Sequence, residues 1–311
     1  KGKTILLPCD DPEWSNFTKF FAQNFKTFGI KKLISTSYAN ESKIYKSNYQ
    51  PTLFEKNNFQ FNQEKSRTKG KIFTLTRDTN KDGKIDIDDL EWKYLEGDGD
   101  FRSDEVKALQ DEADLIITNP PFSLFREFLE WITLTKKKFL IIGSLNAITY
   151  VEVFPLIKEN KMWLGVSSGA KTYLKPDKTF QTMGNTCWYT NIDHGRRHQF
   201  LPLMTMKDNL KFNNLIKNNE HSYKRYDNYN AIEVPRVDGI PSDFDGVMGV
   251  PVSFVDKYNP EQFEILGCDY DVKEGKLSFL INRDWEGKLD RGYVNGQRIY
   301  GRLLIKLIKQ V

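Results

Sequence analysis

The sequence has no run of about 18 apolar residues, the length that a membrane-spanning helix needs. It also has no charged and then apolar leader that ends in a cleavage site. The first absence excludes a protein that spans a membrane with such a helix, and the second gives no indication of secretion. We therefore expect a cytoplasmic protein with no membrane partner.

Cysteine is also scarce, because the chain of 311 residues contains only 3. Cys9, Cys187 and Cys268 are too widely spaced for a disulfide framework or a zinc site, so we expect free buried thiols. The excess of positive charge is small, at 46 Lys and Arg against 42 Asp and Glu. This balance permits DNA binding without demonstrating it, because affinity for phosphates depends on where Lys and Arg cluster.

What the chain does have is an alternation of β-branched segments with segments of helical periodicity. The expected strands are residues 4–7, 33–37, 71–77, 115–118, 139–143, 163–166 and 187–191. The expected helices are residues 14–28, 104–110, 122–134 and 151–159. Phenylalanines recur at helical spacing in the first of these helices, so we expect them in the core, with Gly29 as the C-cap. Such alternation favours an α/β fold with a mostly parallel, doubly wound sheet that binds ligands at the carboxyl ends of its strands.

The alternation decays beyond about residue 196 into Pro-, Asn- and Tyr-rich sequence. Only short strands are expected there, such as residues 263–267 and 277–281. We therefore expect two parts: an α/β domain over residues 1–195, with an inserted region at 50–98, and a smaller mixed region over 196–311.

The most informative segment is a hydrophobic strand that runs directly into Asn119-Pro120-Pro121-Phe122. Each proline fixes its own φ, lacks an N–H group and favours extended geometry in the residue before it. The Asn119 side-chain carbonyl and the Pro120 backbone carbonyl are then free to accept one hydrogen each from an exocyclic NH2 group, while Phe122 offers a ring for stacking. These features predict a pocket for methylation of an amine. The alternative is an ordinary turn that leaves a strand.

The chemistry explains why these residue types suffice. An aromatic amine is a poor nucleophile because its lone pair is delocalised into the ring. Hydrogen bonds from both of its N–H groups to fixed acceptors favour a pyramidal nitrogen, whose lone pair can attack a sulfonium methyl group held in line. Such a displacement needs no covalent intermediate, so its rate comes from positioning and from fixed dipoles.

An acidic-aromatic turn, residues 97–103, lies upstream of the same strand. This turn, followed by the strand and by Asn-Pro-Pro-Phe, resembles the cofactor-adenine and catalytic motifs of S-adenosylmethionine-dependent N6-adenine DNA methyltransferases. Residues 9–17, 248–251 and 256–263 extend the resemblance to the EcoRI-type adenine-specific methyltransferase family. It implies a Rossmann-like fold with a terminal antiparallel strand, an S-adenosylmethionine-binding catalytic domain over 1–195 and a target-recognition region over 196–311.

The resemblance also assigns roles to single residues. The catalytic pocket would consist of Asn119, Pro120, Pro121 and Phe122. The cofactor would be held by Pro8, Cys9, Asp10, Asp11, Tyr38, Asp100 and Phe101. Asp100 would bind its adenine amine, Phe101 would flank its adenine ring, and Asp10 or Asp11 would pair with its methionine ammonium. The chain departs from the usual pattern because no glycine-rich turn follows the first strand, and because Tyr38 stands where an acidic residue usually binds the ribose.

The implied activity is methylation of N6 on an adenine that is extruded from double-stranded DNA, by a monomer that belongs to a restriction-modification system. A cognate restriction endonuclease would be encoded nearby without forming a stable complex. Two alternatives stay open: an RNA guanine-N2 or protein glutamine methyltransferase, and a catalytically inactive, calcium-stabilised DNA-binding relative. Since Lys1 is not an initiator Met and the first strand begins near residue 4, we expect a segment that contacts the cofactor to lie before this sequence.

Basic residues near the end of the α/β part are the candidates for contact with DNA phosphates or guanine edges. They are Lys171, Lys175, Arg196 and Arg197. The alternative is a solvated charged loop, because Lys and Arg are usually exposed whatever their role.

One further motif does not belong to methyl transfer. Residues 78–89, which we name the calcium-like loop, fit the oxygen-ligand pattern of a calcium-binding loop with glycine at the sixth position. The predicted ligands of a structural calcium ion are Asp78, Asn80, Asp82, the backbone carbonyl of Lys84, and Asp89. The alternative is a turn that closes by its own side-chain to backbone hydrogen bonds.

Overall fold

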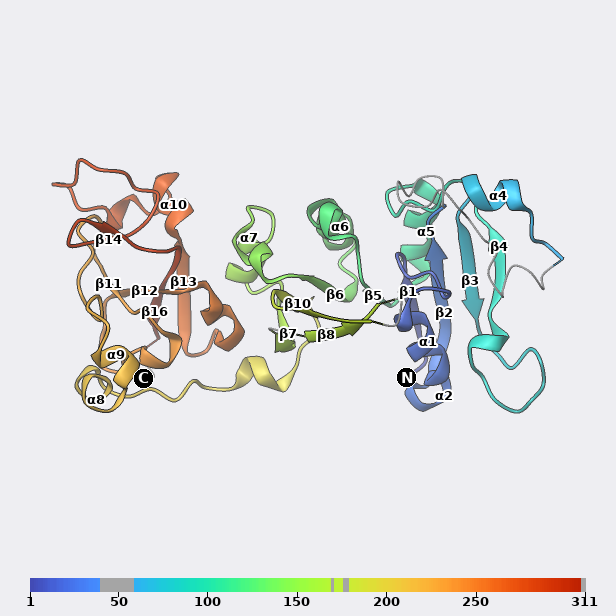
Figure 1. Cartoon of the computed structure of the whole chain (residues 1–311), viewed down its shortest axis with the longest axis horizontal. Helices are drawn as coiled ribbons and strands as arrows, with labels where there is room; N and C mark the ends of the chain where they lie inside the picture. Colours follow the sequence, from blue (N-terminus) through green and yellow to red (C-terminus); the bar gives the residue numbers. More distant parts are fainter. Residues whose placement is uncertain (40–58, 169–170, 176–178, 309–311) are drawn as a thin grey trace. The chain divides into compact units, whose positions relative to one another are not determined.

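A computed structural model describes residues 1–39, 59–168, 171–175 and 179–308 (Figure 1). Residues 50–58 of the expected insertion therefore lie outside the described part of the chain. The chain forms two compact units: unit 1 contains residues 1–145 and 167–192, and unit 2 contains residues 146–166 and 193–311. The boundary that we expected after residue 195 lies close to the one between units at 192 and 193. Residues 146–166, however, belong to unit 2.

Unit 1 is built on a β-sheet with a parallel centre. β1 (Lys3–Leu7) pairs in parallel with β2 (Ile30–Ser37) and with β5 (Leu115–Thr118), and β5 pairs in parallel with β6 (Lys138–Ser144). The sheet continues with strands that run antiparallel to their neighbours, namely β3 (Lys71–Leu75) and β4 (Glu91–Tyr94) beyond β2, and β10 (Thr186–Thr190) beside β6. The expected α/β class and an antiparallel strand after β6 are thus confirmed.

The helices of unit 1 are α1 (Asn16–Gln23), α2 (Phe25–Phe28), α4 (Gln63–Thr68), α5 (Asp104–Glu112) and α6 (Phe125–Leu134), with 3-10 turns η2 (Ile87–Asp89) and η3 (Phe122–Leu124). The expected helix at 14–28 is therefore broken at Asn24. Gly29 ends α2 with a φ of 62°, as predicted for the C-cap. Phe20 and Phe28 are 50% and 41% exposed, so the phenylalanine stripe lies only partly in the core.

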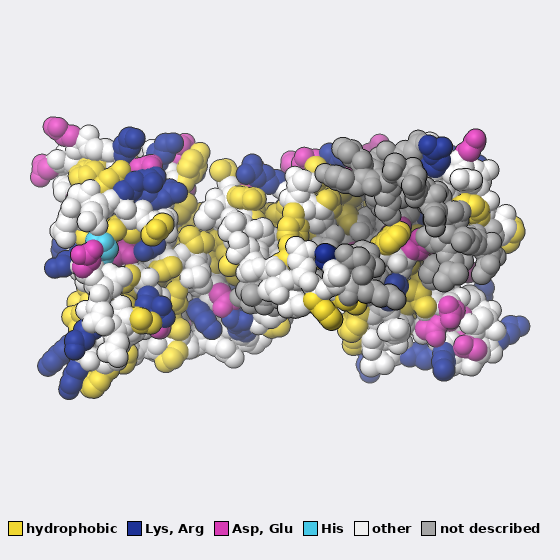
Figure 2. All heavy atoms as spheres, viewed as in Figure 1, with side chains coloured by type: hydrophobic (Ala, Val, Ile, Leu, Met, Phe, Trp, Pro, Cys, Tyr) yellow, Lys and Arg dark blue, Asp and Glu magenta, His cyan; other side chains and the backbone are white. Residues whose placement is uncertain are grey.

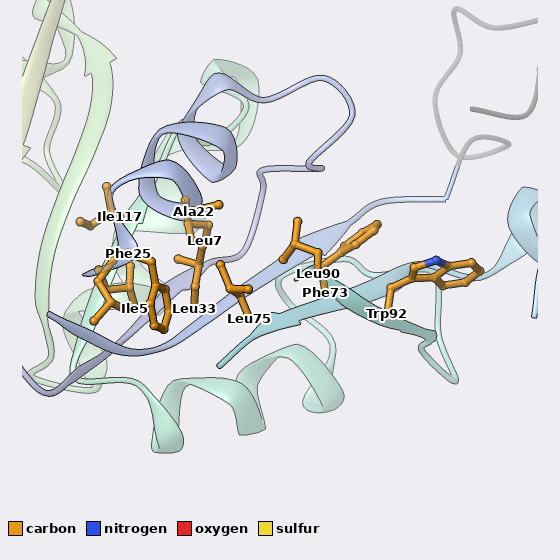
Figure 3. Close-up of a cluster of buried hydrophobic side chains, with 11 residues drawn as sticks. Ile5, Leu7, Ala22, Phe25, Leu33, Phe73, Leu75, Leu90, Trp92 and Ile117 are labelled. Carbon is orange, nitrogen blue, oxygen red and sulfur yellow. The ribbon is translucent and has the colours of Figure 1, made fainter. Parts of the chain in front are cut away.

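One part of the unit 1 core lies where α1 and α2 cover one face of the sheet. Figure 3 shows this cluster of buried side chains, which come from α1, α2, strands β1 to β5 and Leu90. They are Ile5, Leu7, Ala22, Phe25, Ile30, Leu33, Phe73, Leu75, Leu90, Trp92 and Ile117. Strands β1 and β2 alternate little in burial because they lie in the middle of the sheet.

Two strands near the end of unit 1 form a separate sheet. β8 (Lys171–Leu174) and β9 (Phe180–Met183) pair as an antiparallel hairpin. The expected strand at 163–166 is β7 (Trp163–Ser168), which contains the passage of the chain from unit 2 to unit 1.

Unit 2 has its own sheet, with the strand order β11 (Ala231–Glu233), β12 (Val247–Pro251), β16 (Arg302–Leu307) and β13 (Phe263–Cys268). β14 (Tyr293–Val294) and β15 (Gln297–Arg298) form a short hairpin. The helices are α7 (Phe154–Lys158), α8 (Met206–Phe212), α9 (Asn214–Lys217) and α10 (Asp269–Lys273). Short 3-10 turns are η4 (Leu145–Thr149), which begins at the last residue of unit 1, η5 (Gly195–His198), η6 (Val237–Gly239), η7 (Val252–Lys257) and η8 (Ser278–Leu280).

The expected strand at 263–267 is confirmed, but the expected strand at 277–281 is wrong. Residues 278–280 form the 3-10 turn η8, in which the Leu280 N–H group donates to the Leu277 carbonyl. Leu277 and Leu280 are both buried, while Phe279 between them is 67% exposed. A spacing of three places both leucines on one face of a 3-10 turn, whereas a strand would alternate them.

The three cysteines form no disulfide within the described residues; Cys187 and Cys268 are buried, and Cys9 is partly buried. Burial raises the pKa of the Cys268 thiol to about 11. The expectation of buried thiols without disulfides is therefore confirmed for Cys187 and Cys268, whereas Cys9 is only partly buried. No helix in the described ranges is both long enough and apolar enough to cross a membrane.

Candidate active site

The parallel strands of unit 1 bring three predicted segments to one edge of the sheet. Because β1, β2, β5 and β6 are parallel, all of them end at the same edge, which we name the carboxyl edge. Residues 8–11 follow β1, Tyr38 follows β2, and Asn119 follows β5. Ligands of doubly wound sheets bind at this edge.

Asp10 connects the loop after β1 to the end of β5. Its side chain is 2% exposed. One carboxylate oxygen accepts a hydrogen bond from the Ser15 hydroxyl at 2.6 Å, and the other accepts from the Thr118 hydroxyl at 2.5 Å and from the Asn119 N–H group at 3.4 Å. Burial raises the pKa of Asp10, against the effect of these hydrogen bonds. Both oxygens of Asp10 thus accept hydrogen bonds inside unit 1.

Hydroxyl groups replace the missing glycine-rich turn after β1. The Thr36 hydroxyl donates to the Pro8 carbonyl at 2.8 Å, and the Thr18 hydroxyl donates to the Asp10 carbonyl at 2.8 Å. The Ser35 hydroxyl also donates to the Asp10 carbonyl. The loop is therefore held by side chains of α1 and β2, none of which we had predicted from the sequence.

The segment Asn119–Phe122, which we name the carbonyl corner, leaves its acceptors open. The Asn119 side chain is exposed, Pro120 is buried, and Phe122 is 40% exposed. The Pro121 carbonyl accepts from the Leu124 N–H group at 3.0 Å and so starts η3. Within the described ranges, neither the Asn119 side-chain carbonyl nor the Pro120 backbone carbonyl has a hydrogen-bond partner. Two acceptors without a partner among the described residues and one partly exposed aromatic ring thus lie directly after β5.

Two glycines bring the acidic-aromatic turn to the carboxyl edge. Gly99 has a φ of +84°, and a Cβ atom added to it would lie 2.1 Å from the Ser37 carbonyl oxygen. A Cβ atom on Gly70 would lie 2.6 Å from the same oxygen. The Ala39 N–H group donates to the Asp98 carbonyl at 2.8 Å. The turn is thus packed against the end of β2, directly beside the partly buried Tyr38.

Asp100 is already bound within this turn. Its two oxygens accept from the Arg102 guanidinium, from Nε at 2.9 Å and from Nη2 at 2.7 Å, and Arg102 also reaches Glu127 at 2.7 Å. The Arg102 hydrogen bonds lower the pKa of Asp100, so this residue is a carboxylate. An exocyclic amine can share these oxygens with Arg102, because a carboxylate accepts several hydrogen bonds.

Phe101 does not offer the open ring that we expected beside the cofactor. Its side chain is 4% exposed. Its ring packs edge-on against Phe128 at 5.1 Å and Trp131 at 5.8 Å, both on α6. The structure therefore places Phe101 in the core, where it fixes the turn onto α6.

The calcium-like loop is closed by its own hydrogen bonds. The two Asp78 oxygens accept from the N–H groups of Lys81 at 2.6 Å and Gly83 at 2.8 Å. The buried Asp89 accepts from the N–H groups of Thr79 at 2.7 Å and Asp86 at 3.1 Å.

Asn80 and Asp82 accept from the N–H groups of Asp82 and Lys84, each two residues further along the chain. In the part of the chain that the structure describes, no group of three or more His, Cys, Asp or Glu side chains could hold a metal ion. Calcium binding by Asp78, Asn80, Asp82, Lys84 and Asp89 is therefore not supported, and the alternative of a self-closing turn fits.

Two of the candidate DNA-binding residues are engaged inside unit 2. The Arg197 guanidinium lies 3.7 Å from the centre of the Trp163 ring and pairs with Asp193 at 3.0 Å. Hydrogen bonds from Arg197 and His198 lower the pKa of Asp193 to about 2. These contacts attach η5 to β7, so the Arg197 guanidinium is not free for phosphate.

Arg196 is engaged in the same way, because its guanidinium donates to the Val166 carbonyl and to Asp256. Of the two lysines, the Lys171 side chain lies outside the described parts, and Lys175 is exposed. Figure 2 shows Lys and Arg side chains spread over both units and not gathered in a single stripe. The face shown therefore has no dominant basic patch among the residues that are described.

The sequence as a whole is similar to known methyltransferases. The family model described as "Adenine-specific methyltransferase EcoRI" matches residues 1–308. "Type II methyltransferase M.EcoRI" of Escherichia coli is 39% identical over 322 residues, which cover 98% of this chain and 86% of that protein. "Type II methyltransferase M.MgeORF184P" of Mycoplasma genitalium and "Type II methyltransferase M.MpnI" of Mycoplasma pneumoniae are 32% and 31% identical, over 98% of this chain and 88% of each relative. No solved structure matches the chain.

Proposed function

The chain belongs to the EcoRI family of adenine-specific methyltransferases, and we propose that it methylates N6 of an adenine that is extruded from duplex DNA. The observation that carries this proposal is the carbonyl corner with its two open acceptors. An adenine stacked in a duplex cannot reach a pocket at the edge of a sheet, so its nucleotide must rotate out of the helix. The names of the relatives place them in type II systems, which supports DNA as the substrate.

In this proposal the chain's own residues prepare the amine. The Asn119 side-chain carbonyl and the Pro120 carbonyl accept the two N6 hydrogens, and the Phe122 ring stacks on the base. Both acceptors favour a pyramidal nitrogen and stabilise the positive charge that develops on it. The new N–C bond forms as the C–S bond of the donor breaks, and the proton released from N6 passes to water. Asp10 holds the corner in place and takes no part in proton transfer.

S-adenosylmethionine would supply the methyl group as a sulfonium electrophile. The residues at the carboxyl edge fit this molecule, because Asp11 and Asp100 offer carboxylates to its ammonium group and its adenine amine. Asp11 is only partly buried, whereas both oxygens of Asp10 are engaged, so Asp11 is the better partner for the ammonium. Pro8, Cys9 and Tyr38 would line the same edge, with Tyr38 beside the ribose.

We assign methyl transfer to unit 1, with a Rossmann-like methyltransferase fold, and target recognition to unit 2. The parallel centre of the unit 1 sheet and the carbonyl corner at its carboxyl edge support the first assignment. The separate sheet of unit 2 supports the second. The proposal includes a monomer whose partner endonuclease is encoded nearby and forms no stable complex with it.

The test is methyl transfer by the purified protein with labelled S-adenosylmethionine. Mixed-sequence duplex DNA, ribosomal RNA and a peptide release factor are offered side by side. We expect label in DNA alone, on N6 of adenine. Single-molecule sequencing of DNA from cells that express the protein then gives the modified site and its context. Label in RNA or in the release factor, with none in DNA, would contradict the proposal.

A further inference from the structure

The β8–β9 hairpin exposes an apolar pair that nothing in the described residues covers. The strand register places Thr172 opposite Thr182 and Leu174 opposite Phe180, so all four side chains lie on one face of the hairpin. The two threonine hydroxyls lie 3.1 Å apart. Leu174 and Phe180 are 54% and 75% exposed. A two-stranded hairpin is only marginally stable by itself, so a ligand that covers this exposed apolar face would stabilise it.

The strand register also shows where the hairpin leaves the main sheet. β10 is antiparallel to β6, with Thr186 opposite Ser144 at the carboxyl end of β6. β6 is parallel to β5, with Ile141 opposite Thr118. The beginning of β10 therefore lies at the carboxyl edge, which is the edge where Asn119 follows Thr118.

The connection between the hairpin and this edge is short. Only residues 184 and 185 separate β9 from β10. The Leu145 N–H group donates to the Asn185 carbonyl at 2.7 Å, which fixes this connection next to the end of β6. The hairpin thus starts from the same edge as the carbonyl corner, and both belong to unit 1.

We infer that the exposed face of the β8–β9 hairpin enters the DNA duplex beside the target adenine, and that Leu174 and Phe180 occupy the space that the extruded base leaves. This inference rests on the proposed function. A two-stranded ribbon fits the major groove, and apolar side chains commonly insert between base steps and open them. Stacking of Phe180 on the neighbouring bases compensates for part of the free energy lost when the adenine leaves the stack. The Thr172 and Thr182 hydroxyls lie beside this pair and suit phosphate oxygens or base edges.

The experiment uses the purified full chain and a duplex that carries the modified site found by sequencing, with 2-aminopurine in place of the target adenine. Its fluorescence rises when the base leaves the stack. The variants are Leu174→Ala and Phe180→Ala, and the matched control is Leu134→Ala. Leu134 is 77% exposed at the last residue of α6, just before β6 begins, so it lies at the opposite edge of the sheet.

We expect Phe180→Ala to lower the fluorescence rise and to lower kcat/KM on the normal duplex by about tenfold, since loss of one aromatic stack on a base has roughly that effect. Leu174→Ala should act in the same direction, and Leu134→Ala should match the wild type. On a duplex whose target adenine faces an abasic position, the hairpin variants should recover to within about threefold of the wild type, because that base is already unpaired.

Three results would overturn the inference. Equal methylation and fluorescence by Phe180→Ala and Leu134→Ala would exclude a role for the apolar pair. If calorimetry showed that the hairpin variants bind S-adenosylmethionine more weakly but bind DNA as the wild type does, the hairpin would be a cover for the cofactor. If the wild type were a dimer and the hairpin variants were monomers, the hairpin would be a contact between copies of the chain. If the wild type methylates no DNA at all, the proposed function fails as well, so the two failures are distinguishable.

Discussion

The carbonyl corner and the calcium-like loop are both rich in oxygen atoms, and both match a known motif, but only one of them keeps its oxygens available. In the calcium-like loop, Asp78 and Asp89 accept hydrogen bonds from several backbone N–H groups of the same loop. In the carbonyl corner, Asn119 and Pro120 have no such partner among the described residues.

The difference comes from the backbone donors near each set of oxygens. The calcium-like loop contains no proline, so each of its residues brings an N–H group that can fold back onto a nearby side chain. Pro120 and Pro121 remove two donors at the place where Asn119 would otherwise find one. An oxygen-rich motif therefore indicates a binding site only where the N–H groups of the local backbone cannot donate hydrogen bonds to its oxygens.

The largest effect is expected at the carbonyl corner. Asn119→Ala removes one of the two open acceptors, and we expect kcat to fall roughly 10²- to 10³-fold, the usual cost of losing one preorganised group that stabilises developing charge. S-adenosylmethionine binding and the thermal midpoint Tm should stay unchanged, because the Asn119 side chain is exposed. The measurement is single-turnover methylation of duplex DNA. Asn214→Ala, an exposed asparagine of α9 in unit 2, is the matched control.

The next effect tests whether Asp10 positions that corner. In Asp10→Asn, an NH2 group replaces one acceptor and faces the Ser15 or Thr118 hydroxyl. We expect kcat/KM to fall roughly 10- to 100-fold, since small displacements of a catalytic group have effects of this size. The exposed Asp104→Asn is the control. Normal activity in Asp10→Asn would show that the corner holds its geometry without this contact.

The pH dependence of stability gives a second measurement on Asp10. Burial raises its pKa above the unfolded value of 3.8, so the folded chain binds the proton more tightly than the unfolded chain. The resulting stability is fully present below pH 3.8 and is lost as the pH rises through the folded pKa. In urea titrations, the free energy of unfolding of Asp10→Asn should therefore increase relative to that of the wild type as the pH rises from 3.8 through the folded pKa. A constant difference would contradict the raised pKa.

Rules applied to the sequence can predict those parts of the molecule whose structure depends on interactions between residues that are close together in the chain. The prolines of the carbonyl corner, the Gly29 cap and the central strands each depend on residues close together in the sequence. The role of Asp10 depends on Thr118, which lies 108 residues away, and only the pairing of β1 with β5 brings the two together. The signal available in the sequence was an acidic residue, Asp10, shortly after one strand and a hydroxyl residue, Thr118, at the end of another.

Other residues that we had singled out have structural contacts that the sequence does not show. Phe101 could flank a ligand or fill the core, and the aromatic residues of α6 decide for the core. Arg196 and Arg197 could bind phosphate, but β7 supplies a carbonyl and a tryptophan ring that bind them within unit 2. Both choices depend on long-range packing, to which a charge or an aromatic ring in the sequence gives no guide.

A smaller effect is expected in the calcium-like loop. Asp89→Ala removes the acceptor for the N–H groups of Thr79 and Asp86, which then lie in a partly buried loop without that partner. We expect the free energy of unfolding to fall by about 2 kcal/mol, with no change in kcat. Urea denaturation gives the measurement. Asp88→Ala, at the exposed neighbouring position, should have a negligible effect.

The smallest effect is the one expected from calcium itself. A ligand that binds only the folded chain stabilises it by RT ln(1 + [L]/Kd), which is about 2.7 kcal/mol at a concentration 100 times Kd. Since the Asp78 and Asp89 oxygens already accept backbone hydrogen bonds, we expect the Tm in millimolar calcium to equal that in chelator. A rise in Tm with calcium that disappears in Asp78→Asn would show that an ion displaces these backbone donors. The calcium-like loop and the carbonyl corner would then both be binding sites and would differ only in the ligand that each binds.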